Sequence, residues 1–509
     1  MQCTMDAIWE VERRACVRDL VIDSVHIWPL LRIYLHENLF MKLMAIQNGN
    51  PQTSACLPVG QAYDLATNLC ASPASLMSWR TKRNEFRRLL STLEPGGWRI
   101  GRAKPKDNVL ALFLSYSTYR DRIGGLWVDR FCDPLIHSMA ERGHGYVFLE
   151  RQNNITRKRP ALHEAHYINH ELALATAVAM LRRRRLDPDT LRGLREAKSI
   201  WESMLLPHAF PSLEWIFRRF AIADSMSSVF LRWMRRTGAR IGISASYYSI
   251  TGLAFNLACR RAGIPSVDIQ HGLQNYDHCA YAEWLSLPEK GYEVLPTIFW
   301  CWSDMEKEQI ENWGRKTYGA HWAVVGGNVW HEFCAAGGFA SGAAKQTGGH
   351  NILVTLQPWP MDITGLIADV IKLTPSDWIW WLRLHPQMRE QRHYDALERL
   401  FRGAGNVRIR EATETPLPAL LRYMDLHVTA NSSAIFEASQ FGVRSIMTDG
   451  VLVPTYQTVI DKGMAAFAGT PAEVAALARS WAVRSRVAVS APARHLEEGL
   501  AALYAAVGL

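Results

Sequence analysis

At 509 residues the chain is longer than one hydrophobic core usually serves, so we expect two domains with additional segments. Its composition, 48% hydrophobic and 21% charged without a low-complexity tract, excludes a disordered or fibrous protein. No run of about 18 apolar residues occurs, so the sequence predicts no membrane-spanning helix.

The net charge of +9 is accompanied by basic runs in the first half of the chain, within 80–88, 157–159 and 182–185. Such runs are most often solvated helix faces, and the functional alternative is attraction to an anionic membrane surface or a phosphorylated acceptor. No helix-turn-helix, zinc-finger or RNP pattern accompanies the charge, so we expect no nucleic-acid partner.

The termini and cysteines bear on the cellular compartment. Residues 1–14 are mixed in charge and lack the apolar core of a signal peptide. Nine cysteines without a CxxC pair favour reduced thiols over a disulfide framework or a zinc site. We therefore expect a cytoplasmic protein, peripheral to the inner face of the membrane if the basic runs bind lipid.

The first 104 residues are predicted to form a helical extension. Pro29 stands near the start of an apolar helix, which also carries Trp28, Arg32, Tyr34 and Lys42. These side chains suit a helix at a membrane interface. We favour the alternative, in which this helix packs on the domain that follows.

Strand-length apolar runs then alternate with helical segments. In residues 105–320 they occur at 108–115, 146–150, 239–246, 265–270 and 297–303, with a long helical insertion before 237. This alternation predicts a Rossmann-like domain.

A Gly/Ala/Ser-rich stretch at 334–350 has the composition of a linker, and six further strand-length runs follow it. We expect a second Rossmann-like domain over 321–475 and C-terminal helices over 476–509. The predicted fold is α/β, with two doubly wound domains facing across a cleft. Ligands of such sheets bind beyond the carboxyl ends of the strands.

One candidate site follows the strand that ends at Gln270. His271 titrates near working pH and can accept a proton, while Gly272 permits positive φ or a close backbone approach. Asp277 and Glu283, on the loop beyond, are candidates to orient the histidine or to act as a second catalytic group.

Another candidate site lies in the second domain. Ser432 and Ser433 open a helix expected to run to Gly442, and a helix start with hydroxyls beside it can bind an anion. Glu437 lies one turn further and can accept hydrogen bonds from ribose hydroxyls, although an ordinary capping arrangement is an equal alternative. His385, held extended by Pro386, ends another strand.

The order of these motifs, His-Gly, His-Pro and then Ser-Ser-x3-Glu-Ala, resembles the GT-B superfamily glycosyltransferases of bacterial surface polysaccharides. It is also similar to teichoic-acid glycerophosphotransferases and to capsule transferases that use CMP-activated acidic sugars such as Kdo. The resemblance implies that His271 is the catalytic base, supported by its neighbours Gln270 and Gly272. It also implies a donor nucleotide site formed by His385, Pro386, Ser432, Ser433 and Glu437.

The leading hypothesis is a glycosyltransferase that moves a sugar from a nucleotide sugar to a surface polysaccharide or a lipid-linked acceptor. We expect no resident cofactor and no metal, because the Asp187-Pro188-Asp189 triplet is better interpreted as a helix cap than as a metal-binding DxD motif. The alternatives are a glycerol- or ribitol-phosphate transferase, a nucleotide-sugar epimerase, and a non-catalytic subunit of a polysaccharide assembly complex.

Overall fold

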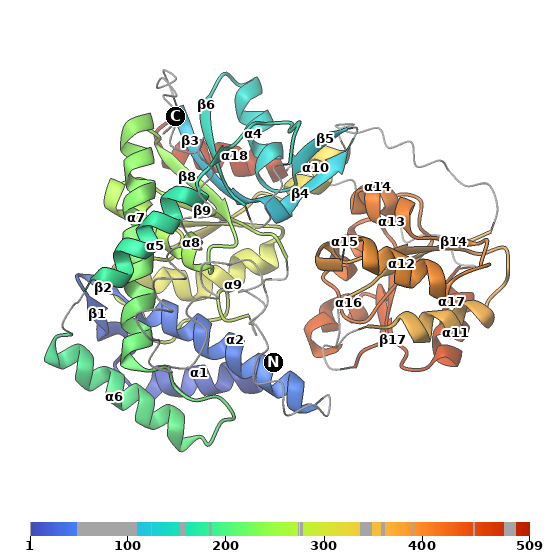
Figure 1. Ribbon diagram of the computed structural model, residues 1–509, viewed down its shortest axis with the longest axis horizontal. Coiled ribbons are helices and arrows are strands. Elements are labelled where there is room, and N and C mark those ends of the chain that lie inside the picture. Colours follow the sequence, from blue (N-terminus) through green and yellow to red (C-terminus); the bar gives the residue numbers. More distant parts are fainter. Residues whose placement is uncertain are drawn as a thin grey trace, which may run out of the picture. The chain divides into compact units, whose positions relative to one another are not determined.

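The computed structural model describes residues 2–47, 109–123, 125–152, 158–182, 186–272, 274, 278–335, 349–357, 362–388, 390–450, 453–482 and 495–509. The chain forms two compact units (Figure 1). The first is built from described residues within 1–120, 129–329 and 494–509, and the second from those within 121–128 and 330–493.

The first unit is built on a parallel sheet with the order β11-β10-β9-β8-β3-β6-β7. Its strands are β3 (Val109–Tyr116), β6 (Gly145–Arg151), β7 (His166–Tyr167), β8 (Ile241–Ala245), β9 (Ser266–Ile269), β10 (Ile298–Cys301) and β11 (Trp322–Val325). Its helices beyond residue 109 are α4 (Cys132–Glu141), α5 (Asn169–Leu181), α6 (Pro188–Ser203), α7 (Leu213–Thr237), α8 (Ile250–Ala262), α9 (Asp304–Gly314) and α18 (His495–Ala506). The strand order reverses between β3 and β8, as in a Rossmann fold.

Strand β3 shows why the sheet is buried on both faces. All of its residues are buried, and alternate side chains point to opposite faces. Leu112 and Leu114 join the core that contains α7 and α8, whereas Ala111 and Phe113 join the core that contains α4 and α18. A run that is apolar throughout, rather than alternating, is therefore what this strand requires.

The N-terminal helices pack into the first unit. Helices α1 (Gln2–Arg14) and α2 (Trp28–Gln47) flank a short hairpin of β1 (Val21–Ile22) and β2 (Val25–His26). Trp28 and Arg32 are buried, and both donate hydrogen bonds to Glu12 Oε1, at 2.8 and 2.7 Å. The structure thus agrees with packing of this segment rather than with a membrane-interface helix.

The second unit has a parallel sheet with the order β14-β13-β12-β15-β16-β17. Its strands are β12 (Asn351–Thr355), β13 (Ile379–Arg383), β14 (Val407–Arg408), β15 (Leu426–Thr429), β16 (Arg444–Met447) and β17 (Ala465–Phe467). Its helices are α10 (Val329–Ala335), α11 (Thr364–Lys372), α12 (Gln391–Leu400), α13 (Arg410–Glu414), α14 (Leu417–Leu421), α15 (Ala434–Gln440), α16 (Gln457–Asp461) and α17 (Pro471–Ala482). The order reverses between β12 and β15, so the predicted class of two doubly wound, Rossmann-like sheets is confirmed.

Two segments belong to a different unit from the residues that precede them in the sequence. The hairpin of β4 (Arg120–Ile123) and β5 (Leu126–Asp129) belongs mainly to the second unit, and α18 returns to the first, where Leu500 and Leu503 are buried. No sequence pattern indicates either assignment. Among the described helices, none has the length and apolar character needed to cross a bilayer.

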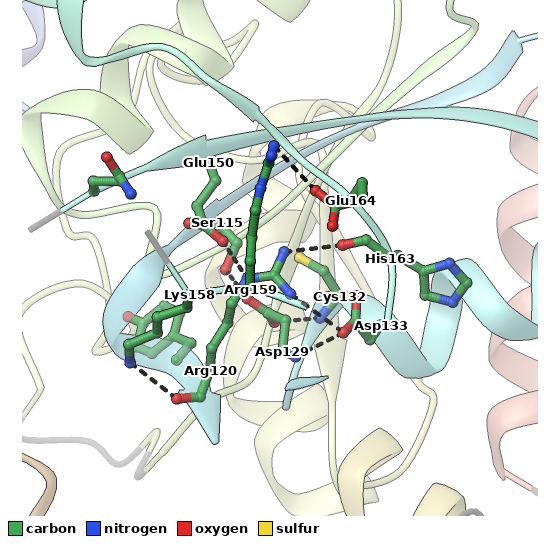
Figure 2. A network of polar contacts seen from close by, with 12 residues as sticks. Ser115, Arg120, Asp129, Cys132, Asp133, Glu150, Lys158, Arg159, His163 and Glu164 are labelled. Atoms are coloured by element: carbon green, nitrogen blue, oxygen red, sulfur yellow. Dashed lines mark hydrogen bonds and ion pairs between the residues drawn. The ribbon is translucent and has the colours of Figure 1, made fainter. Parts of the chain in front are cut away.

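A buried charge network lies at the base of the β4–β5 hairpin (Figure 2). Arg120 is 1% exposed, and its Nε donates to Glu150 on β6. Its Nη2 donates to the His163 carbonyl at 3.1 Å, and its Nη1 lies 3.7 Å from Asp133 Oδ2. The guanidinium of Arg120 therefore joins β6, α4 and the backbone at His163 within the first unit.

The carboxyl groups of this network hold the start of α4. Asp129 Oδ1 accepts from the backbone amides of Phe131 and Cys132, at 3.0 and 2.8 Å. Ser115 donates to the other oxygen of Asp129 at 2.5 Å. Burial, reinforced by the nearby Asp129, raises the pKa of Asp133 to about 8, so this carboxyl is mostly protonated at neutral pH.

Replacing Arg120 with methionine should lower the free energy of unfolding by about 3–5 kcal/mol, because the buried carboxyl group of Glu150 loses the guanidinium that pairs with it. Arg122→Met is the matched control, since Arg122 is exposed on the same strand and should change stability by less than about 0.5 kcal/mol. Denaturant unfolding followed by far-ultraviolet circular dichroism measures both. Equal losses in the two variants would contradict a stabilising role for the network.

Candidate functional site

The carboxyl edge of the first sheet gathers polar side chains at the β3/β8 reversal. The chain leaves β8 through Ser246, which has a φ of 63°, and starts α8 at its N-cap Ser249. His271 follows β9, the next strand. This is the edge at which ligands of doubly wound sheets bind.

Gln270 fixes the backbone that carries His271. Its Oε1 accepts from the Trp302 amide at 2.7 Å, and its own carbonyl accepts from the Trp302 indole at 3.1 Å. Its Nε2 donates to the Gly272 carbonyl at 3.0 Å. These bonds attach the turn at residues 270–272 to the end of β10, so Gln270 orients the histidine without touching its ring.

The imidazole of His271 lies among aromatic side chains. Its Nε2 is 3.1 Å from the Tyr248 hydroxyl, and the rings of Tyr119, Phe131 and Tyr248 have centroids about 6 Å away. Burial lowers the pKa of His271 to about 4, and the charge of Arg130 adds to this effect. The ring is therefore neutral at pH 7. Its Nε2 can accept a proton from a ligand that displaces the Tyr248 hydroxyl.

Asp268 holds the two loops around the histidine. Its carboxylate accepts from the Tyr247 amide at 3.0 Å and from the Tyr281 hydroxyl at 2.9 Å. Burial raises the pKa of Asp268 to about 7, while the hydrogen bonds from Tyr281 and Tyr247 oppose this rise. Because Tyr248 follows Tyr247, Asp268 positions the hydroxyl that contacts His271.

The other predicted residues of this edge differ in their placement. Gly272 does not have a positive φ, so that expectation is wrong, and a Cβ there would meet no heavy atom within 4 Å. Glu283 forms an ion pair with Lys316 at 2.9 Å, and the structure does not bring its carboxylate to His271. Asp277 lies outside the described residues.

The histidine's loop is also supported from the N-terminal helices. The guanidinium of Arg32 donates to the carbonyls of Cys279, Ala282 and Glu283 at 2.9–3.1 Å, and it lies 3.9 Å from the ring centroid of Trp284. The extension predicted from sequence thus buttresses the segment that follows the candidate base.

The carboxyl edge of the second sheet gathers the other motifs. His385 follows β13, and Ser432 and Ser433 follow β15, on either side of the central strand β12. Strands two apart in a sheet are separated by about 10 Å. One ligand of nucleotide size can therefore touch both motifs.

Asn431 joins three chain segments at this edge. Its amide donates to Gln357 Oε1, beyond β12, at 3.3 Å, and its Nδ2 donates to Asp449 Oδ2, beyond β16, at 3.1 Å. Its carbonyl accepts from the Tyr456 hydroxyl at 2.9 Å. Gln357, Asn431 and Asp449 are not among the residues predicted for the nucleotide site, although each stands within two residues of a strand end.

The serine motif forms a shorter helix than expected. Helix α15 covers Ala434–Gln440, and Ser432 Oγ accepts from the Ala434 amide at 3.2 Å. Ser433 makes no side-chain cap and is half-buried. Glu437 Oε2 lies 2.9 Å from His331 Nε2 on α10, so this carboxylate already has a partner within the second unit.

Beneath this edge, His427 forms a buried polar relay across the sheet. Its Nε2 contacts Thr355 Oγ1 at 2.8 Å, and its Nδ1 contacts Ser445 Oγ at 2.9 Å. Burial lowers the pKa of His427 to about 3, so the ring is neutral and links the end of β12 to β15 and β16.

The predicted residues His385 and Pro386 lie just beyond β13. His385 is half-buried, and the exposed Pro386 begins a short 3₁₀ turn, Pro386–Met388.

The geometry of the described residues does not support a metal-binding site. In the part of the chain that is described, no group of three or more His, Cys, Asp or Glu side chains is placed to hold a metal ion. Asp187 is the N-cap of α6 and accepts from the amides of Asp189 and Thr190 at 3.0 and 2.8 Å, which confirms its interpretation as a helix cap.

Comparison with known proteins finds no matching family model and no match among curated sequences. Solved structures that resemble the chain include one described as a UDP-N-acetylglucosamine 2-epimerase from Listeria monocytogenes, with a TM-score of 0.47 and 11% identity, over 79% of this chain and 96% of that one. A UDP-GlcNAc 2-epimerase from Methanocaldococcus jannaschii, in complex with UDP-GlcNAc and UDP, gives 0.45 and 12%, over 78% and 99%. The glycosyltransferase SnogD from Streptomyces nogalater gives 0.41 and 15%, over 79% and 95%.

The strand orders and their edges define the class of this protein, an α/β protein with two Rossmann-like domains. The similarities at 11–15% identity assign no family to the chain. Its function has to be argued from the residues at the two strand edges.

The imidazole of His271 should remain neutral down to about pH 5, because its pKa is about 4 in this aromatic surrounding. Nitrogen-15 NMR of histidine-labelled protein measures the titration, and the His271→Gln spectrum assigns the signal. A midpoint near the ordinary value of 6.5 would show that the ring is solvated rather than enclosed.

Proposed function

We propose that the chain is a GT-B glycosyltransferase that moves a sugar from a nucleotide sugar to a glycan or a lipid-linked acceptor. One observation carries the proposal. The second sheet presents His385 and the Ser432–Ser433 motif on either side of its central strand, at the edge where doubly wound sheets bind nucleotides.

The second unit would hold the nucleotide of the donor. The hydroxyls of Ser432 and Ser433 and the ring of His385 are suited to donate hydrogen bonds to phosphate oxygens. The bonds of Asn431 to Gln357 and Asp449 fix the backbone that presents the serines. Glu437, engaged by His331, would reach a ribose hydroxyl only through its remaining acceptor capacity.

The first unit would supply the base. The neutral Nε2 of His271 would accept the proton of the acceptor hydroxyl, which takes the place of the Tyr248 hydroxyl beside this nitrogen. The surrounding rings of Tyr119 and Phe131 suit the apolar faces of a sugar. A pKa of about 4 makes this a weak base, so proton transfer would accompany departure of the nucleotide rather than precede it.

The finer identity of the reaction rests on the motifs alone. A CMP-activated acidic sugar is the donor that the capsule-transferase resemblance favours, and the enzyme would work in the cytoplasm at the membrane surface. We propose that no metal or cofactor takes part and that polar side chains balance the phosphate charge.

Nucleotide release from a panel of CMP-, CDP-, UDP- and GDP-sugars tests the proposal. We expect release from one nucleotide class, accelerated by a polysaccharide acceptor. Conversion of the sugar without an acceptor would instead indicate an epimerase, and turnover of CDP-glycerol or CDP-ribitol a polyol-phosphate transferase. No turnover of any donor would leave only a non-catalytic subunit.

Replacing Ser432 and Ser433 together with alanine should raise the donor KM by at least about tenfold, because hydrogen bonds to a charged phosphate contribute about 1.5–3 kcal/mol each. Ser439→Ala is the matched control, since its hydroxyl donates to the Phe436 carbonyl within α15. A KM unchanged in the double variant would remove the serines from the nucleotide site.

His271→Ala should lower kcat by about a hundredfold to ten-thousandfold, the usual contribution of a general base, with little change in the donor KM. His350→Ala serves as a control, because His350 precedes β12 at the opposite edge of its sheet. Single-turnover kinetics measures both variants. Full activity of His271→Ala would exclude this histidine as the base.

A further inference from the structure

Helix α5 of the first unit exposes a cluster of large apolar side chains. Leu174, Val178, Met180 and Leu181 are 63%, 41%, 45% and 84% exposed. No other helix in the described parts of the chain carries more than one such side chain. Scattered exposed leucines are normal, but four exposed apolar side chains close together on one helix mark a contact surface.

Three of these four side chains lie on the side of α5 that faces away from the protein. Leu174, Val178 and Leu181 follow the i, i+4, i+7 spacing of one helix face. The opposite face contains the buried residues Leu172, Ala175, Thr176 and Ala179. Figure 1 shows α5 beside α7, and Trp233 of α7 donates to Glu171 of α5 at 2.8 Å. The helix is therefore anchored by one apolar face and presents another.

Basic side chains lie at both ends of this exposed face. Arg182 directly follows the helix and pairs with Asp224 at 2.9 Å. At the other end, exposed Arg236 lies 6.0 Å from the ring centroid of Trp233, the residue bonded to Glu171.

We infer that α5 is a membrane-docking element that lays Leu174, Val178 and Leu181 into an anionic lipid surface. An apolar face between arginine groups matches a lipid bilayer with anionic headgroups, in which leucines enter the acyl boundary and guanidinium groups stay at the headgroups. The net charge of +9 favours the same partner. Helix α2 does not provide such a surface, because its Trp28 and Arg32 are buried.

The inference deepens the proposed function, because membrane docking would bring the protein to a lipid-linked acceptor. The biological role of docking therefore rests on the proposed function. Vesicle binding itself requires no donor and no turnover. A failure of the transferase assay and a failure of docking can therefore be told apart.

Flotation of the full-length protein with vesicles of phosphatidylcholine, with and without about 30 mol% of the anionic lipid phosphatidylglycerol, tests the inference. We expect flotation with the anionic vesicles and at least a tenfold lower partition coefficient for Leu174→Asp/Leu181→Asp. Leu400→Asp, an isolated exposed leucine on α12, is the matched control and should bind like the unmodified protein. Thermal unfolding checks that the variants are folded.

The charge contribution has its own variant. Arg236→Gln should weaken binding several-fold at low salt and reduce its salt dependence. In all of these variants, the rate of nucleotide release from the donor should be unchanged when the acceptor is short and water-soluble.

Three results would overturn the inference. The unmodified protein could fail to float with anionic vesicles, or the α5 variant could bind as well as Leu400→Asp. Light scattering could instead show a dimer that the α5 variant converts to a monomer with vesicle binding intact, which would make this face an interface between two copies.

Discussion

The carboxyl edge of a parallel sheet is the constraint on which the candidate sites depend. Each sheet is buried on both faces, so polar side chains on its strands can reach a ligand only where the strands end. In each unit the strand order reverses beside the first strand, which brings strand ends together from distant parts of the chain. His271 and the Ser432–Ser433 motif both occupy such edges.

Burial then decides the chemical state of the polar groups near these edges. It lowers the pKa of His271 to about 4 and that of His427 to about 3, so both rings are neutral, and it raises the pKa of Asp268 to about 7. Neutral rings can accept a proton or relay hydrogen bonds, whereas a solvated histidine would be partly charged. The same cause raises the pKa of Asp133 within the Arg120 network, which fixes the start of α4.

Much of the fold could be predicted because apolar runs of strand length are a local signal. The run at 108–115 became β3, and the second series of runs became the six-stranded sheet. The return of α18 to the first unit and the exchange of the β4–β5 hairpin could not be predicted, since a helix or hairpin carries no local sign of its partner. The predicted positive φ of Gly272 was wrong for a related reason, because the conformation of this residue depends on the loop closed by Gln270.

The sequence by itself determined where strands end and which polar residues follow them, because the apolar pattern of a buried strand is written in consecutive residues. Only the tertiary structure decided which of those residues meet. Tyr248 contacts His271 from another loop, Gln357 accepts from Asn431 across 74 positions, and His331 engages Glu437 across 106. Such contacts depend on strand order and helix packing, and these are fixed by the burial of the whole core rather than by any single segment.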